Sequence, residues 1–260
     1  MTELEIYVDV AASGRLMAHL LEPPGFGPRF ESRVDMDHRL PGALKQHLEW
    51  LRSHGEPSPD PTTLTFRIAA EVAVVGNLES GDDVGFYAPD IIPVSPEEVE
   101  RYLRIAGYAH EDLLRLVAGL SDDTLGWVRD ERTRPIRRII RHVVRAELWY
   151  MTRIIDDPAA TEMPPVLTDA DQQIDTTEDI VEWLRIVWPA FQAWARSLTP
   201  ELRSRTTMPT WFTERKDERW TARKMLRRCI EHCREHTRNI EQILVAYRAA
   251  AARQEHARGM

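Results

Sequence analysis

Two spacings of hydrophobic residues divide the chain near residue 95. Before that point, apolar and polar positions alternate in short runs separated by turn residues, a period of two that is typical of β-strands. After it, apolar residues recur every three or four positions over long stretches, which is the period of amphipathic helices. The pattern therefore predicts an α+β chain, with a small sheet domain over residues 1–94 and an all-α domain over residues 95–260.

The first part is predicted to contain a hairpin, a helix and a returning strand. Residues 4–10 and 15–21 alternate in polarity around a Ser-Gly turn, which favours a β-hairpin. A helix is expected over about residues 40–53, with Pro41 near its first turn. The β-rich run 62–75 should then return to the same sheet.

The second part is predicted to form four long helices. Ser95, followed by Pro96 and two glutamates, is a typical helix start because it offers an N-cap, a proline at the first helical position and early acidic residues. The four helices are expected over about residues 95–120, 133–155, 177–197 and 221–251, with connections over 121–132, 156–175 and 199–219. Amphipathic helices of this length pack as a four-helix bundle.

Two histidines fall on the apolar face of the last predicted helix. His232 and His236 are four residues apart, so their side chains lie one above the other, in a stripe that also contains Met225 and Cys229. Two neutral imidazoles at this spacing can share a metal ion, with a third ligand from another helix. His142, which borders the apolar stripe of the second helix, is the candidate. Three protein ligands would leave positions for water or substrate, as in catalytic metal sites.

Each of these residues also has a plainer interpretation. A histidine pair at this spacing can be only solvated or hydrogen-bonded, and Cys229 could be a fourth metal ligand or a small buried hydrophobe. Glu147 could orient a ligand histidine or move a proton, or it could form a helical salt bridge. Four aromatic residues could line a pocket or simply pack in the core or an interface: Trp149, Tyr150, Trp188 and Trp211.

Composition places the chain among globular proteins. Of 260 residues, 43% are hydrophobic and 29% are charged. No apolar run approaches the roughly 20 residues of a membrane span, and the N-terminus has no secretory pattern, so we expect a cytoplasmic protein without membrane contact. Cys229 and Cys233, one helical turn apart, are expected to be reduced thiols.

The charge is unevenly distributed. Residues 1–95 hold 15 acidic and 7 basic residues, whereas residues 96–260 hold 27 of each, and an acidic first part argues against binding a phosphate backbone. Basic residues on the second and fourth helices could still contact nucleic acid, but the balanced charge favours a solvated face paired with acidic neighbours. These residues are Arg134, Arg137, Arg138, Arg141 and Arg145, with Arg223, Lys224, Arg227 and Arg228.

Two segments of the second part resemble the DinB/YfiT-like family. Residues 133–150 contain His142 followed five residues later by glutamate, as on the family's second helix. In residues 219–243, a Trp-Thr pair leads into His232-x-x-x-His236, and the segment ends in Gln-Ile, as on the family's HxxxH helix. The resemblance covers about residues 96–250.

This resemblance implies a fold, a cofactor and an activity. In that family three histidines bind a divalent metal, often zinc or nickel, in a four-helix bundle that frequently dimerises. For this chain the ligands would be His142, His232 and His236, and the protein would be a homodimer. Several members of the wider superfamily are metal-dependent transferases that act with a low-molecular-weight thiol, so the resemblance implies an enzyme with a small-molecule thiol substrate.

The first part resembles the HicB-type fold, a small and partly degenerate RNase H-like unit. The residues that carry this likeness are Ile6-Tyr7-Val8, residues 14–19, the turn Pro24-Gly25-Phe26 and the helix end Leu48-Glu49-Trp50-Leu51. The turn continues as Gly-Pro rather than being of the usual Pro-Gly-Cys type, and no DNA-binding ribbon-helix-helix tail is evident, so antitoxin function is not implied. The alternative to an enzyme is a non-catalytic binding or scaffold protein, whose HicB-like domain recruits a protein or nucleic-acid partner.

Overall fold

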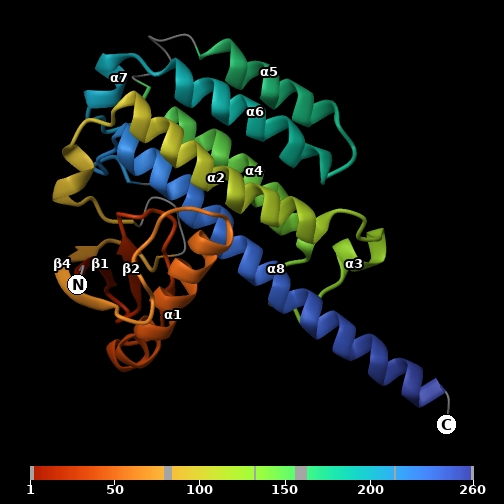
Figure 1. The fold of residues 1–260 in the computed structure, drawn as a ribbon. Coiled ribbons are helices and arrows are strands. Elements are labelled where there is room, and N and C mark those ends of the chain that lie inside the picture. The colour runs from red at the N-terminus through yellow and green to blue at the C-terminus, as the bar shows by residue number, and fades with distance from the viewer. Residues whose placement is uncertain (1–2, 79–83, 132, 156–162, 214, 259–260) are drawn as a thin grey trace.

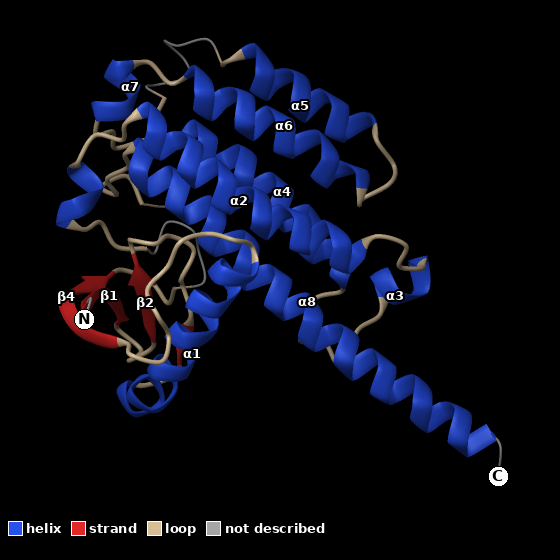
Figure 2. Cartoon of the chain, viewed as in Figure 1, coloured by secondary structure: helices blue, strands red, loops and turns tan. Residues whose placement is uncertain are grey.

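The fold combines a small sheet with a larger helical part. The computed structural model describes residues 3–78, 84–131, 133–155, 163–213 and 215–258. The four strands lie together near the N-terminus, with one long helix packed beside them, and the rest of the chain is helical (Figures 1 and 2). The predicted α+β class is therefore confirmed.

The sheet is built around its first strand. β1 (Glu3–Ala11) pairs antiparallel with β2 (Leu16–Leu20) and parallel with β4 (Thr65–Val74). β3 (Arg29–Phe30) pairs antiparallel with β2, so that the strand order is β3-β2-β1-β4. The predicted hairpin and the return of residues 62–75 to the same sheet are both confirmed.

The helix between β3 and β4 starts earlier than predicted. α1 (Arg33–Ser53) begins after Ser32, whose Oγ accepts a hydrogen bond from the backbone N–H of Asp35 at 3.2 Å. Pro41 lies inside this helix and not in its first turn. Buried apolar residues before and after the proline share one face, and their packing against the sheet holds the helix together through it.

Four long helices form the frame of the helical part. They are α2 (Pro96–Val117), α4 (Ile136–Thr152), α6 (Glu182–Ser197) and α8 (Ala222–Arg258). α2 and α4 each pack against both α6 and α8. The predicted start of α2 is confirmed by a capping box, because the Ser95 and Glu98 side chains each accept a hydrogen bond from the other's backbone N–H, at 3.1 and 2.8 Å.

Shorter α-helices occupy segments that were predicted as connections: α3 (Asp122–Gly126), α5 (Pro165–Thr176) and α7 (Pro200–Ser204). The 3₁₀-helix η2 (Ala88–Ile91) lies earlier in the chain, where no element was predicted. The largest correction is α5, which packs on α6. Pro164 and Pro165 occupy its N-cap and first position, where a missing N–H costs nothing, so these prolines start the helix rather than interrupt it. The predicted connection also includes residues 156–162, which lie outside the described ranges.

α8 is the central element and also projects beyond the rest of the molecule at its C-terminal end (Figure 1). One side of its N-terminal half packs on α2 and α4, and the turn at Gly25 packs on another side. Gly25 has a φ of +101°, and a Cβ there would lie 2.7 Å from the Ile230 side chain. The carbonyl of Gly25 accepts a 2.7 Å hydrogen bond from Arg234. Only glycine allows this close approach of the turn to α8.

Charged side chains fill the contact between the sheet and α8. His19 of β2 lies between two carboxylates, 3.0 Å from Asp9 of β1 and 3.2 Å from Glu231 of α8. Arg227 of α8 forms ion pairs with Asp90, at 2.9 Å, and with Glu231, at 3.4 Å. None of these five side chains is accessible to solvent. The sheet and α8 are therefore joined by a buried ionic network.

The predicted solvated face of α8 is wrong. Arg223, Lys224, Arg227 and Arg228 are 7%, 0%, 0% and 0% exposed. Their carboxylate partners are Glu98, Glu218, Asp90 and Glu231. The prediction assumed that α8 buries only its apolar face against other helices, whereas the sheet and η2 cover its charged face as well. These basic side chains are not available to nucleic acid.

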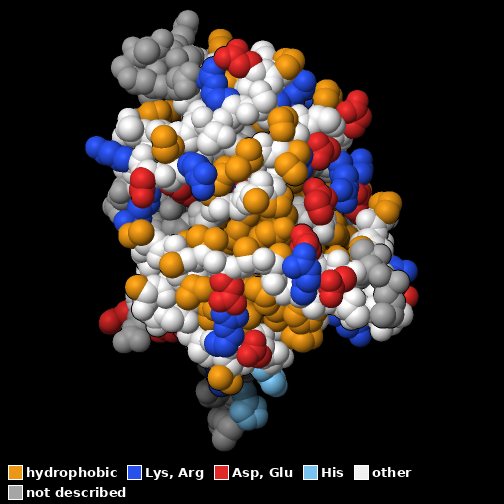
Figure 3. All heavy atoms as spheres, turned by 90° about the vertical axis from the view of Figure 1, so that its left-hand side faces the viewer, with side chains coloured by type: hydrophobic (Ala, Val, Ile, Leu, Met, Phe, Trp, Pro, Cys, Tyr) orange, Lys and Arg blue, Asp and Glu red, His pale blue; other side chains and the backbone are white. Residues whose placement is uncertain are grey.

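The surface carries apolar side chains that gather across the middle of the face shown in Figure 3. Over the whole described chain, the exposed large hydrophobic residues are Val34, Val75, Ile91, Ile92, Val128, Met208, Phe212 and Val245. None of the described helices combines the length and the apolar composition that crossing a membrane requires. The homodimer stays a prediction.

Candidate metal centre

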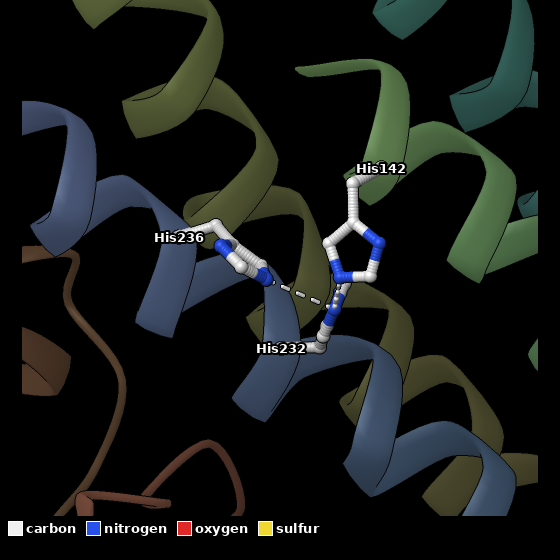
Figure 4. A group of neighbouring side chains, drawn as sticks. All are labelled: His142, His232 and His236. Atoms are coloured by element: carbon white, nitrogen blue, oxygen red, sulfur yellow. Dashed lines mark hydrogen bonds between the residues drawn. The ribbon is translucent and has the colours of Figure 1, made fainter. Parts of the chain in front are cut away.

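Three histidines from two helices point their Nε2 atoms toward one another (Figure 4). His232 and His236 lie one turn apart on α8, and His142 approaches them from α4. The Nε2 atom of His232 is 3.0 Å from that of His142 and 3.1 Å from that of His236. Within the described ranges these are the side chains whose potential ligand atoms gather, all within 4.8 Å of one another.

The environment keeps all three imidazoles neutral. Burial, followed by the neighbouring histidines, holds the pKa of His232 well below its usual value, and burial lowers the pKa of His236 to about 3. The more exposed His142 has its pKa lowered by burial and then by the nearby Arg134 and Arg29 guanidinium groups. A neutral imidazole keeps the lone pair that a metal requires, so the histidines are in the form that binds metal.

The two nitrogen separations that involve His232 are also close to those of a metal site. Nitrogen ligands at 2.0–2.1 Å from a tetrahedral ion lie about 3.3–3.4 Å apart, slightly more than the separations of His232 from its two neighbours. A set of three neutral nitrogen donors suits zinc and nickel. One feature differs from most such sites: the Nδ1 atoms of His232 and His236 are buried with no hydrogen-bond partner in the described part of the chain.

The histidines line a pocket of about 910 Å³ between α4, α8 and the sheet side of the molecule. Trp149 and Tyr150 are part of its wall, as the aromatic pattern allowed. Trp188 instead stacks on His110, and Trp211 packs on the Arg153 guanidinium, so neither of these two lines the pocket. The neighbours Phe212 and Thr213 line it instead.

The charge of the pocket wall is strongly positive. Of the residues that the structure describes, five arginines and one carboxylate, that of Glu235, line it. The arginines are Arg29, Arg129, Arg134, Arg145 and Arg228. Arg134 and Arg145 belong to the predicted arginine row, whose other members do not line the pocket. Sequence reasoning missed Arg29, because a residue of a two-residue strand carries no pattern that connects it with helices more than a hundred residues later.

Glu147 lies away from the pocket and does not meet the ligand histidines. It is 4% exposed, and its Oε2 atom has no hydrogen-bond partner among the residues that the structure describes. Burial raises its pKa to about 8. Glu147 therefore does not form the helical salt bridge that was one interpretation of it. It also does not orient His232 or His236 by a hydrogen bond, because the Nδ1 atoms of both histidines have no partner among the described residues.

Both cysteines are free and buried. Burial, followed by the nearby Glu147, holds the pKa of Cys229 and of Cys233 well above the ordinary thiol value. A protonated thiol is a poor metal ligand. This environment fits the interpretation of Cys229 as a small buried hydrophobe rather than a fourth ligand.

Comparison with known proteins identifies the helical part. No curated protein and no solved structure matches the chain. The model of the DinB superfamily matches residues 108–240, which run from α2 to α8 and include all three histidines. The match spans just over half of the sequence and excludes the sheet. The chain belongs to the DinB superfamily.

Proposed function

We propose that His142, His232 and His236 hold a divalent metal ion, zinc or nickel, at the wall of the pocket. The observation that carries this proposal is the convergence of three neutral Nε2 atoms beside an open cavity. Two ligands from one helix and one from another are held by packing of α4 on α8, which fixes their separation. We further propose that α2, α4, α6 and α8 are the four-helix bundle of a DinB-like protein.

The proposed reaction is the addition of a low-molecular-weight thiol to a small electrophilic acceptor: the sulfur forms the new bond, a multiple bond or strained ring bond of the acceptor breaks, and the thiol proton passes to the acceptor. A divalent metal held by three neutral imidazoles would keep its full positive charge and lower the pKa of a bound thiol or water. The chain itself supplies the neutral ligands, the aromatic wall of Trp149 and Tyr150, and a pocket large enough for a small thiol beside them. The exposure of His142 leaves the site accessible from solvent.

Metal content tests this proposal directly. Protein purified without a histidine tag and supplied with zinc or nickel should carry about one divalent ion per chain, measured by elemental mass spectrometry. His232→Ala and His142→Ala should each lower that content to near zero, since two remaining imidazoles bind far more weakly. His38→Ala, at an exposed position of α1, is the control and should bind metal like the wild type.

A wild-type chain that stays metal-free after both metals are offered would refute the metal site. If the site is loaded, the metal-bound protein should transfer a thiol in a panel of bacillithiol, mycothiol, glutathione and coenzyme A, and the metal-free protein should not. The non-catalytic alternative, in which a HicB-like sheet recruits a partner to an inert scaffold, predicts full metal loading without turnover.

A further inference from the structure

The cations nearest the histidines come from different parts of the chain. Arg29 belongs to β3 in the sheet, Arg134 precedes α4, and Arg228 lies one turn before His232 on α8. All three lower the pKa of His236 through their positive charge, so they surround the histidine cluster. The sheet therefore contributes directly to the wall of the pocket that holds the candidate metal ligands.

Arg29 and Arg228 each leave a donor without an acceptor. Arg29 pairs with Glu235 at 2.9 Å, and Arg228 is held by Glu231 at 2.6 Å, with Tyr150 Oη accepting a further bond at 3.4 Å. The Nε atoms of both arginines are buried, and neither has a hydrogen-bond partner in the described ranges. A buried N–H donor without an acceptor costs roughly 1–3 kcal/mol, so two such donors beside one pocket call for an acceptor.

The remaining arginines of the wall differ in how far they are neutralised. Arg145 forms ion pairs with Asp171 and Asp175, and Arg129 pairs with its neighbour Asp130. Arg134 is exposed and forms no ion pair with any residue that the structure describes. Among the described residues of the wall, Arg134 is thus the arginine without a counter-charge, whereas Arg29 and Arg228 are ion-paired and each keep one unpartnered Nε–H donor.

We propose that this pocket binds its small substrate through an oxyanion group, a carboxylate or a phosphate, held by Arg29 and Arg228 with Arg134 at the mouth. Guanidinium groups present planar sets of N–H donors that match both kinds of oxyanion, and charge-assisted hydrogen bonds are stronger than neutral ones. The acceptor of the thiol, or the thiol itself, then carries this group. The proposal deepens the proposed function and rests on it for the pocket being the substrate site.

This assignment gives the sheet a role in substrate recognition. β3 places Arg29 next to α8, and the buried network around His19 and Glu231 keeps the sheet from moving relative to that helix. A helical part alone would lack one of the two arginines that hold the oxyanion. The first part of the chain is thereby a component of the site and not an independent module.

Anion binding by the full chain tests the proposal. Metal-free protein, prepared with a chelator, is titrated by isothermal calorimetry with succinate and separately with inorganic phosphate, at constant ionic strength. Saturable binding at about one site per chain is expected for at least one of them. Arg29→Gln and Arg134→Gln should each weaken that binding roughly tenfold or more. Arg33→Gln, which removes the same charge next to β3 but outside the pocket, is the matched control and should bind like the wild type.

The outcomes separate the two proposals. Binding of succinate alone assigns a carboxylate, binding of phosphate alone assigns a phosphate, and binding of both supports the shared chemistry. No saturable binding to either the metal-free or the metal-loaded chain, or binding that Arg29→Gln and Arg134→Gln leave unchanged, would overturn the anion site even if the histidines bind metal. Normal anion binding by a chain that never takes up metal would instead refute the metal site alone.

A structural side effect of the substitutions is checked independently. Thermal unfolding without ligand shows whether Arg29→Gln is folded, since this variant leaves Glu235 without its partner. Arg29→Lys keeps the positive charge but loses the planar set of guanidinium N–H donors, so the affinity of this variant for the anion should lie between those of the wild type and Arg29→Gln. If Arg29→Gln does not fold, the exposed Arg134→Gln decides the outcome, because that side chain makes no ion pair within the described ranges.

Discussion

Glu147 shows how a single side chain can depart from the behaviour of its type. Acidic residues are rarely buried without a partner, yet Glu147 is 4% exposed on α4, and its Oε2 atom has no hydrogen-bond partner among the described residues. With a pKa near 8, the carboxyl group is mostly protonated at neutral pH. It therefore sits in the core as a neutral acid.

This environment predicts a pH dependence of stability. Because the pKa of Glu147 is raised in the folded state, from the ordinary 4.5 to about 8, its carboxyl group destabilises the fold progressively as pH rises between those two values. Glu147→Gln keeps the shape without the charge. The variant should match the wild type near pH 5 and be more stable by a few kcal/mol, an order-of-magnitude figure, at pH 8 and above.

Urea unfolding of both proteins at a series of pH values measures the difference. Glu178→Gln, at an exposed position, serves as the control and should show no such trend. A stability difference between Glu147→Gln and the wild type that stays constant from pH 5 to pH 9 would contradict the assignment of a neutral buried acid.

The sequence pattern predicted the positions of the histidines better than it predicted which other residues surround them. His232 and His236 share the apolar stripe of α8, and that face geometry holds in the structure. Glu147 carried a similar signal that was not used: it lies four residues from Val143 and four from Met151, both buried, so its spacing alone placed it in the core. The sequence around Arg29 contains no such signal, because the position of Arg29 in the pocket depends on how the sheet packs against α8.

At the scale of elements, α8 is a helix that buries charge on one side and apolar groups on another. Arg227 of this helix pairs with Asp90, and Glu231 pairs with His19, and all four side chains are inaccessible to solvent. Removing one partner from such a network leaves an uncompensated buried charge. Asp90→Asn should therefore reduce the free energy of unfolding by about 3–5 kcal/mol, measured by urea denaturation.

An exposed ion pair provides the comparison. Glu100 pairs with Arg196 at 2.9 Å on the surface, with both side chains about half exposed. Glu100→Gln should change stability by roughly 1 kcal/mol or less, because solvent already screens this pair. If the Glu100 and Asp90 substitutions lowered the free energy of unfolding by similar amounts, the buried network at α8 would contribute no more to stability than a surface ion pair does.

Element prediction succeeded where periodicity and caps agreed, and failed where prolines were read as breaks. α2 and α8 begin near their expected positions because a capping box or a Trp-Thr entry precedes an apolar stripe. Residues 156–175 were predicted as a connection because they contain three prolines and no strong helical period, although Leu167, Ala170 and Ile174 do have helical spacing. The physical distinction is whether a proline precedes the first turn or interrupts a later one.

For the whole molecule, the buried network predicts that sheet and helices unfold together. Separation of the two parts would break the ion pairs that cross between them, His19 with Glu231 and Asp90 with Arg227, so each part alone would keep charged groups without their full set of partners. Differential scanning calorimetry of the metal-free chain should show one transition, with equal calorimetric and van't Hoff enthalpies. Two well-separated transitions would show that the parts are stable independently.

The short strand β3 has a consequence for how long the protein survives. Arg29 belongs to a strand of only two paired residues and contacts α8 through its ion pair with Glu235. A ligand bound by both Arg29 and Arg228 would therefore link the sheet to α8 as long as it stays bound. Such a ligand stabilises the folded chain by mass action, by about 2.7 kcal/mol at a hundred times its dissociation constant. Because cells degrade unfolded chains, the abundance of the protein would then follow the supply of the compound it binds.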